Sequence, residues 1–364
     1  MSRLRVGVVG CGAIAQIHHL PNLTALHEHF EVSVVCDVSP SAAAAAARRF
    51  HVPEHVTDYR RVLDSDVDAV VLCHTDPKTE AAVATLQAGK HLFIEKPVCF
   101  SLQEMDAMIA AHGSGLVAQA AYVKVYEPGF ELAQQAVGRM DDIRFVQINH
   151  LHPDNRLHLQ QFDLERFDDH PAGSLEAATE ARRAAYRQAI GEVDEELERA
   201  FGLLTGSMIH DLYTLRVMVG RPSDVIGVEI WREGRAVTCT LGFPNGARCV
   251  ATWIDLPDLW DFYETLEIYG DAQRVLLSYP TGFARGIPCT LTVQGSDEEG
   301  RAYRSEPAVD WESAFARELR HFHASVVDGV PNRTPLADAR HDVSLIIDIV
   351  RRYQASAGTG APAC

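Results

Sequence analysis

The sequence has no long uninterrupted hydrophobic run, and no stretch of it approaches the roughly 18 apolar residues that a helix needs to span a bilayer. Its start, MSRLRVGVVGCGAIA, combines two arginines with a short apolar run. Glycines interrupt that run, however, and a strand–turn–helix pattern explains it better than a signal peptide does. We therefore expect a cytoplasmic protein without a membrane partner.

Runs of lysine or arginine are also missing. The chain has 33 Lys and Arg against 50 Asp and Glu, which gives a formal net charge of −17. Nucleic-acid binding needs a concentrated positive surface, so we expect no nucleic-acid partner. We interpret the acidity as a feature that favours solubility.

The eight cysteines contain no CxxC pair and no spacing typical of metal ligands. Several of them, including Cys36 and Cys73, fall in apparent buried strands, where reduced core thiols are the simplest interpretation. Two HxH patterns, at residues 150–152 and 321–323, have no third ligand nearby at a suitable spacing. We therefore predict no metal site.

The first 123 residues alternate between short β-rich runs and helical patterns, which is typical of a parallel sheet with crossover helices. Strands are expected at 4–10, 31–37, 68–73, 91–95 and 115–123. Helices are expected from about residue 13, at 41–50, 59–65 and 79–90, and after a capping box formed by Ser101 and Glu104. Residues 1–123 are thus predicted to form a dinucleotide-binding α/β Rossmann domain.

Residues 124–364 are predicted to form an α+β domain with a large, mostly antiparallel open sheet. Strands are expected at 143–150, 224–231, 236–243, 247–254, 262–270 and 274–279, and helices at 204–219, 311–328 and 335–356. Asn245-Gly246 predicts a type I′ hairpin turn, because both central residues of that turn need positive φ. Residues 153–200 are polar and then strongly helical; an insertion or lid over the site and a solvated surface helix pair are the two interpretations.

A GxGxxA loop follows the first expected strand and precedes a helix. Gly10 permits the tight turn, Gly12 lets the backbone approach a pyrophosphate, and Ala15 allows close helix–strand packing. The N–H groups at the start of the helix, including those of Ala13 and Ile14, favour binding of a diphosphate. We assign Gly10, Gly12, Ala13 and Ile14 to the cofactor site.

Asp37 ends the second expected strand, where a carboxylate accepts hydrogen bonds from the adenosine ribose hydroxyls and repels a 2′-phosphate. The next residues, 38–40, include no Arg or Lys that would neutralise such a phosphate. NAD is therefore predicted as the cofactor in preference to NADP. A helix cap is the alternative role for Asp37, although Ser39 and Ser41 are available for it.

These features resemble the glucose–fructose oxidoreductase/inositol dehydrogenase (Gfo/Idh/MocA) family over nearly the whole chain. The matching pieces are GCGAIA at 10–15, the strand-end Asp37, AGKHLFIEKP at 88–97, AYVKVYEP at 121–128 and MIHDLYTLRVMVG at 208–220. The resemblance implies a dehydrogenase or reductase acting on a CH–OH group of a sugar, sugar derivative or cyclitol. It also implies a homodimer or homotetramer formed through the second-domain sheet.

The resemblance places Lys96 beside the nicotinamide and the substrate hydroxyl. A partly buried lysine can act as the base that takes the hydroxyl proton, or it can stay cationic and polarise the oxygen. His210 matches the family's catalytic histidine, which passes the proton onward or orients the hydroxyl; a helix histidine bonded to a backbone carbonyl is the alternative. Thr75 and Glu95 are assigned to the cofactor site with Lys96.

The sequence departs from the family at two positions. Where inositol-dehydrogenase-like members have an Asp four residues before the histidine, this chain has Gly206, and the usual Asp three residues after the histidine is replaced by Tyr213. Because these positions share a helix face with His210, we expect Tyr213 to hydrogen-bond beside His210 as a substitute. Asp211 points elsewhere and is expected to be a structural partner.

Polar residues after the domain crossover are assigned to the substrate side of the site: Lys124, His150, His152, Asn155 and Arg156. Two other functions stay open at this stage. One is a redox-neutral enzyme that uses NAD transiently to cleave a glycosidic bond or eliminate a group. The other is a non-catalytic regulator that binds NAD or a sugar.

Overall fold

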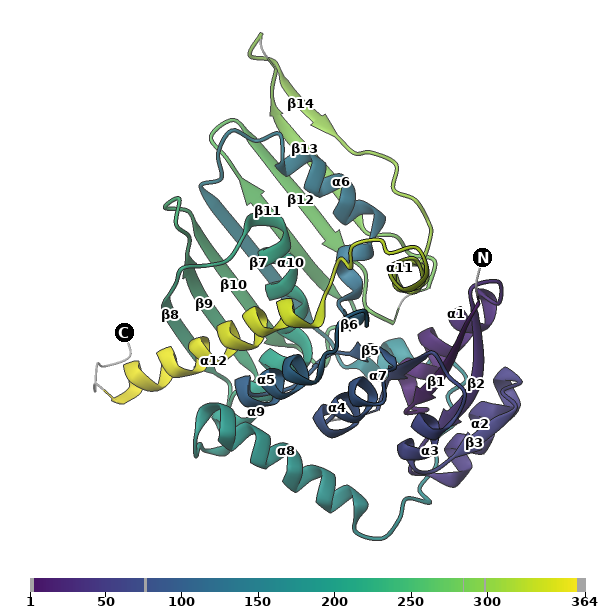
Figure 1. Cartoon of the computed structure of the whole chain (residues 1–364). Helices are drawn as coiled ribbons and strands as arrows, with labels where there is room; N and C mark the ends of the chain where they lie inside the picture. The colour runs from purple at the N-terminus through teal and green to yellow at the C-terminus, as the bar shows by residue number, and fades with distance from the viewer. Residues whose placement is uncertain (1–2, 75–76, 284, 298, 359–364) are drawn as a thin grey trace. The chain divides into compact units, whose positions relative to one another are not determined.

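The computed structural model in Figure 1 describes residues 3–74, 77–283, 285–297 and 299–358. The chain forms two compact units. The first unit comprises Met1–Tyr122, Phe162–Ala189 and Phe315–Val343, and the second comprises Val123–Gln161, Ile190–Ala314 and Ser344–Cys364. The chain thus returns to the first unit twice after Tyr122, whereas the sequence suggested a single boundary at residue 123.

The first unit contains a six-stranded sheet in the order β3-β2-β1-β4-β5-β6. Every pair in it is parallel, which is the Rossmann arrangement expected from the sequence. Its strands are β1 Leu4–Val9, β2 Phe30–Cys36, β3 Glu54–Val56, β4 Ala69–Leu72, β5 His91–Glu95 and β6 Ala118–Ala121. β4 is apolar throughout and β1 is apolar except for Arg5, because helices cover both faces of such a sheet. β3 was not predicted.

Helix starts in this unit follow from local sequence. Ser39 caps α2, because its Oγ accepts the N–H of Ala42 at 3.0 Å, and Pro40 fits the first helical position. Ser101 and Glu104 form the expected capping box of α5. The helices are η1 Ala15–His19, α1 Leu20–Ala25, α2 Pro40–Phe50, α3 Tyr59–Asp64, α4 Thr79–Gln87 and α5 Leu102–Ala111. Later parts of the chain add α8 Ser174–Ile190, α11 Ala314–Val327 and the start of α12 Leu336–Gly358.

The second unit contains an eight-stranded sheet in the order β14-β13-β12-β11-β7-β10-β9-β8 (Figure 1). Only β7 and β10 pair in parallel within it, so the expected mostly antiparallel open sheet is confirmed. The strands are β7 Phe145–His152, β8 Asp224–Trp231, β9 Ala236–Gly242, β10 Arg248–Asp255, β11 Tyr263–Tyr269, β12 Gln273–Tyr279, β13 Thr290–Ser296 and β14 Ala302–Ser305. The last two were not predicted.

One face of this sheet carries the core of the second unit. Side chains alternate along β7, where Val146, Ile148 and His150 are buried and the residues between them are half-exposed. Helix α6 packs against β12 and β13. The helices of this unit are η2 Val123–Tyr126, α6 Pro128–Val137, α7 Asn155–Leu159, α9 Glu195–Leu203, η3 Leu204–Met208, α10 Ile209–Val219 and the part of α12 that follows Val343.

The hairpin between β9 and β10 is present, but the expected type I′ turn is wrong. The Gly246 N–H donates to the Phe243 carbonyl at 2.9 Å, so the central residues of the turn are Pro244 and Asn245. Proline holds φ near −65°, which a type I′ turn forbids. Gly246 follows with φ of 87°, and Asn245 does not adopt a positive φ. The loop is a type I turn followed by a left-handed glycine.

Residues 153–200, the expected insertion or lid, contain α7, α8 and α9. Helix α8 is exposed over most of its length but buries Tyr186, whose ring lies 4.8 Å from that of Phe100 within the first unit. Closure of this segment over a ligand stays a prediction. No helix in the described part of the chain has both the length and the apolar composition to cross a membrane.

Candidate active site

The glycine loop after β1 has the geometry of a tight turn against the sheet. Gly10 adopts φ of 97°, and a Cβ there would lie 2.3 Å from the backbone nitrogen of His74, so only glycine fits. A Cβ at Gly12 would meet nothing within 4 Å, which leaves open space in front of the backbone for a close ligand. Ala13 and Ile14 begin the helical segment after this loop. Thr75, also assigned to the cofactor site, lies outside the described residues.

Asp37 lies beside the glycine loop. Its Oδ2 accepts the N–H of Cys11 at 2.8 Å and its Oδ1 accepts the N–H of Ser39 at 2.9 Å. The cap of α2 is Ser39, so Asp37 is not needed for that role. The half-buried Asp37 carboxylate is thus fixed at the edge of the loop, where hydroxyl donors of a ribose can reach it.

Glu95 and Lys96 follow each other at the carboxyl end of β5. The Glu95 carboxylate is buried, contacts His19 Nε2 at 2.6 Å and accepts the Lys96 N–H at 3.0 Å. Burial by itself raises the pKa of Glu95, but the hydrogen bond and charge of His19, with the charges of Lys96 and Lys78, lower the pKa overall. Glu95 is therefore an ionised anchor for the backbone of the half-buried Lys96.

Sequence reasoning missed Lys78, which supports the same turn. Its side chain is buried, and its Nζ donates to the Pro97 carbonyl at 3.0 Å. The sequence offered no signal for this role, because the burial of Lys78 is visible only in the fold.

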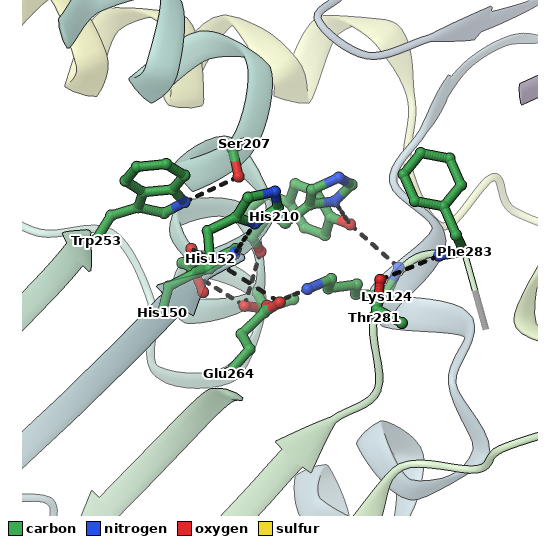
Figure 2. Close-up of polar contacts among 12 residues, drawn as sticks. Lys124, His150, His152, Ser207, His210, Trp253, Glu264, Thr281 and Phe283 are labelled. Carbon is green, nitrogen blue, oxygen red and sulfur yellow. Dashed lines mark hydrogen bonds and ion pairs between the residues drawn. The ribbon is translucent and has the colours of Figure 1, made fainter. Parts of the chain in front are cut away.

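In the second unit, a group of buried ionisable residues lies where α10, η2, β7 and β11 meet (Figure 2). Lys124 Nζ pairs with the Glu264 carboxylate, and His150 Nδ1 lies 2.8 Å from Asp211 Oδ2. All four side chains are buried. We call these four residues the buried quartet. Two of them, Asp211 and Glu264, were not assigned to the site from the sequence.

Three members of the buried quartet, His150, Asp211 and Glu264, hold potential metal-ligand atoms within 4.8 Å of one another. The Lys124 ammonium pairs with Glu264 in this same group. A lysine cation thus already compensates the carboxylate charge that would otherwise attract a metal ion. We therefore interpret the buried quartet as a proton-sharing group.

A chain of hydrogen bonds leads outward from the buried quartet. His150 Nε2 lies 3.1 Å from His152 Nδ1, and His152 Nε2 lies 3.1 Å from Asn155 Oδ1 (Figure 2 labels both histidines). An amide oxygen only accepts, so His152 Nε2 carries the hydrogen and its Nδ1 accepts one from His150. Neutral His150 then accepts at Nδ1 from a protonated Asp211; alternatively, cationic His150 donates to an ionised Asp211.

The electrostatics of this chain agree with a shared proton. Burial raises the pKa of Asp211 to about 7, partly offset by the Lys124 charge. Burial also lowers the pKa of His152 to about 3, with the His150 charge contributing. His152 is therefore neutral at pH 7, while Asp211 gains or loses its proton close to that pH.

This arrangement predicts a pH-dependent stability. The Asp211 pKa rises from 3.8 to about 7 on folding, so between those values the folded state holds more protons than the unfolded state. Folding stability contributed by Asp211 therefore falls as pH rises from about 4 to about 7. We expect Asp211→Asn to remove this pH dependence of the free energy of unfolding. The stability of the variant, measured against that of wild type, should therefore be higher at pH 8 than at pH 5. Urea midpoints at both values measure it; equal differences at the two pH values would contradict the shifted pKa.

His210 and Tyr213 lie together on α10, as the spacing predicted. His210 Nδ1 is 2.8 Å from the Tyr213 hydroxyl, which also accepts the Lys124 N–H at 3.1 Å. Tyr213 is completely buried and His210 is half-buried. Tyr213 thus joins His210 to the backbone of Lys124 and fixes the orientation of the imidazole.

A cavity of about 780 Å³ opens within the second unit next to this chain. Its lining includes His152, Asn155, Gly206, Ser207 and Trp253. The Trp253 indole donates to Ser207 Oγ at 2.9 Å and stacks on His152 with ring centroids 5.3 Å apart. A Cβ at Gly206 would meet nothing within 4 Å, so the glycine leaves room that an Asp would fill.

Ion pairs balance the charges in the cavity wall. Arg235 contacts the Asp255 carboxylate at 2.8 Å, and Arg199 lies 3.9 Å from the Glu233 carboxylate. A cavity of this size, with an aromatic face and paired charges, suits a neutral polar ligand. Arg156, which was assigned to the substrate side, is exposed on α7. Its Nε donates to Asp154 Oδ2 at 2.6 Å.

Part of the chain is similar to known oxidoreductases. Residues 4–122 match the model of an oxidoreductase family with an NAD-binding Rossmann fold. The inositol 2-dehydrogenase/D-chiro-inositol 3-dehydrogenase of Shouchella clausii is 33% identical over 160 residues, which are 40% of this chain and 45% of the relative. The first curated relatives are matched over only 37–45% of their own length.

Solved structures share the fold over almost the whole chain. A levoglucosan dehydrogenase in complex with NADH has a TM-score of 0.76 at 20% identity and covers 97% of this chain and 98% of that one. KijD10, a 3-ketoreductase from Actinomadura kijaniata in complex with NADP, has a TM-score of 0.72 at 19% identity, with 96% and 98% covered. Residues 4–122 are thus similar to the NAD-binding Rossmann segment of the Gfo/Idh/MocA oxidoreductase family.

Proposed function

We propose that this chain is an NAD-dependent dehydrogenase or reductase acting on a secondary hydroxyl of a sugar, sugar derivative or cyclitol. The observation that carries the proposal is the matched Rossmann segment, in which Asp37 is fixed beside the glycine loop by the N–H groups of Cys11 and Ser39. Relatives named for inositol oxidation and a structural neighbour named for levoglucosan support the substrate class.

Gly10, Gly12, Ala13 and Ile14 would hold the diphosphate of the dinucleotide, and Asp37 would hold the adenosine ribose. When bound, the nicotinamide supplies a hydride acceptor or donor. NAD is proposed over NADP because the Asp37 carboxylate repels a 2′-phosphate; the structural neighbours named above were solved with NADH in one case and NADP in the other.

Lys96 is proposed to take the hydroxyl proton of the substrate, and His210 to orient that hydroxyl. The cavity lined by His152, Asn155 and Ser207 is proposed to hold the polyol, because polar groups in its wall can contact the hydroxyls of a sugar ring. His152, which lines this cavity, connects through His150 to Asp211, so these residues provide a route for a proton to a buried carboxyl group.

Tyr213→Phe is expected to lower kcat by roughly tenfold to a hundredfold, because it removes the hydroxyl that orients His210. KM for the polyol should change less than kcat, since the substitution leaves the cavity wall intact. Steady-state kinetics measure both parameters, and Tyr279→Phe, a buried tyrosine of β12, is the control. Unchanged kcat in Tyr213→Phe would remove this positioning role.

The proposed activity is tested by adding NAD to the protein with a panel of inositols, hexoses and anhydrosugars and following absorbance at the NADH band. At least one polyol should give sustained NADH formation. Product formation without net NADH would favour a redox-neutral reaction. NAD binding without turnover of any polyol in either direction would point to a regulator.

We also propose a cytoplasmic homodimer or homotetramer that associates through the open face of the eight-stranded sheet. That face carries half-exposed residues of mixed character, including Phe145, Gln147 and Tyr269. Mixed aromatic and polar surfaces of this kind are typical of protein interfaces.

A further inference from the structure

A segment outside the matched Rossmann region lies against the cofactor loop of the first unit. Residues 162–170, FDLERFDDH, carry four carboxylates and one arginine, and we call them the acidic strap. Gln16, which follows the glycine loop, donates from Nε2 to the Glu165 carbonyl at 3.0 Å and accepts the Glu165 N–H at 3.1 Å. The same Gln16 amide donates to the Cys11 carbonyl at 2.9 Å, so the acidic strap is joined directly to the loop.

The other end of the acidic strap reaches the start of α2. The Asp169 carboxylate accepts the Ser39 hydroxyl, and its Oδ2 accepts the Ser41 N–H at 3.0 Å. Further along α2, Arg48 contacts Glu165 at 3.3 Å and Arg49 donates to the Asp163 carbonyl at 2.7 Å. The acidic strap therefore runs along α2. Its Asp169 contacts Ser39, which is two residues after Asp37 in the sequence.

Asp37 and Asp169 share Ser39. The Ser39 N–H donates to Asp37 Oδ1 at 2.9 Å, while the Ser39 hydroxyl donates to Asp169. In a 2′-phosphorylated dinucleotide, the phosphate is attached to the ribose oxygen whose hydroxyl would otherwise donate to Asp37. A ribose bound at Asp37 would therefore place this phosphate near Ser39. The hydroxyl of Ser39 and the N–H of Ser41 at the start of a helix are donors well suited to such an anion.

We propose that Asp169 is a cofactor-specificity residue, which occupies these donors with its own carboxylate and so excludes a 2′-phosphorylated dinucleotide. The inference rests on the proposed function, in which Asp37 holds the adenosine ribose. The hydrogen bonds from Ser39 and Ser41 lower the pKa of Asp169 to about 2, so the competing anion is charged at neutral pH. Selectivity for NAD thus comes both from the strand end and from a segment about 130 residues further along the chain.

The test compares 5′-AMP with 2′,5′-ADP, which differ only in the 2′-phosphate, by isothermal titration calorimetry on the full chain without substrate. Asp169→Asn removes the charge and Asp169→Ala removes the acceptor as well. Asp168→Asn is the matched control, because it makes the same charge change one residue away and the described residues show no hydrogen bond from α2 to Asp168.

Both Asp169 variants should bind 2′,5′-ADP at least about tenfold more tightly than wild type, with 5′-AMP affinity changed by less than about threefold. Asp168→Asn should behave as wild type. An unchanged preference in both Asp169 variants, or an equal gain in Asp168→Asn, would overturn the role of Asp169 and leave the cofactor site intact. Failure of wild type to bind 5′-AMP and NAD at all would overturn the proposed cofactor site and this inference with it.

Discussion

Lys96→Ala is expected to lower kcat by roughly a hundredfold to ten-thousandfold, the range that a positioned acid or base contributes to proton transfer. The dissociation constant for NAD should stay within about threefold of wild type, because the glycine loop and Asp37 are untouched. Glu95 holds the backbone of Lys96 through an ionised carboxylate at the end of β5, so the substitution removes an amine from a fixed position. Stopped-flow absorbance at the NADH band and calorimetry with NAD measure the two quantities.

Lys90→Ala is the matched control, since Lys90 precedes the same strand and donates from Nζ to the Val67 carbonyl at 2.8 Å. It should keep normal kcat. Lys96→Arg separates the two roles left open for Lys96: an arginine stays cationic and can polarise an oxygen but does not act as a base at neutral pH. Near-normal kcat in Lys96→Ala would remove Lys96 from the proposed chemistry.

Lys124→Met is expected to destabilise the fold by roughly 3–5 kcal/mol at pH 7, because it leaves the buried Glu264 carboxylate without its cation. The loss should shrink towards pH 5, where the raised pKa values of Glu264 and Asp211 let these groups become neutral. Urea unfolding at pH 5 and pH 7 measures the difference. An equal loss at both pH values would show that packing of the lysine stem, and not charge, is responsible.

The double variant Lys124→Met/Glu264→Gln tests whether the unpaired charge of Glu264 causes the loss of stability in Lys124→Met. Removing both charges should recover most of the stability lost in Lys124→Met, since no buried charge is then left unpaired. Glu264→Gln alone leaves the lysine cation buried beside a neutral amide and is expected to be destabilised as well. A double variant no more stable than Lys124→Met would contradict the ion-pair interpretation.

The geometry of the glycine loop and the position of Asp37 were predictable because their signals are local in sequence, whereas cofactor binding there stays a prediction. Gly10 and Asp37 each follow from a single sequence position. Gly10 adopts a φ of 97° in the tight turn, and Asp37 lies beside the loop, as expected. The pairing of His210 with Tyr213 was predictable for the same reason, because the three-residue spacing on a helix brings the side chains together.

The buried quartet was not predictable in this way, because four separate elements bring its members together. One signal for Glu264 was available. Residues two apart in a strand lie on the same face, so Glu264 lies on the same face as Leu266 and Ile268, which are both buried. Asp211 was expected to be structural, yet it contacts His150 from 61 residues away. β13 and β14 were missed because polar and half-exposed residues dominate them, which weakens the apolar alternation that identifies a strand.

In the proposed function, Asp37 and Lys96 mark the two ends of one bound dinucleotide. A crystal structure of the chain soaked with NAD tests this most directly. It should show the adenosine ribose hydroxyls hydrogen-bonded to the Asp37 carboxylate and the Lys96 amine next to the nicotinamide ring. An empty glycine loop in crystals saturated with NAD, or a nicotinamide bound far from Lys96, would contradict the account.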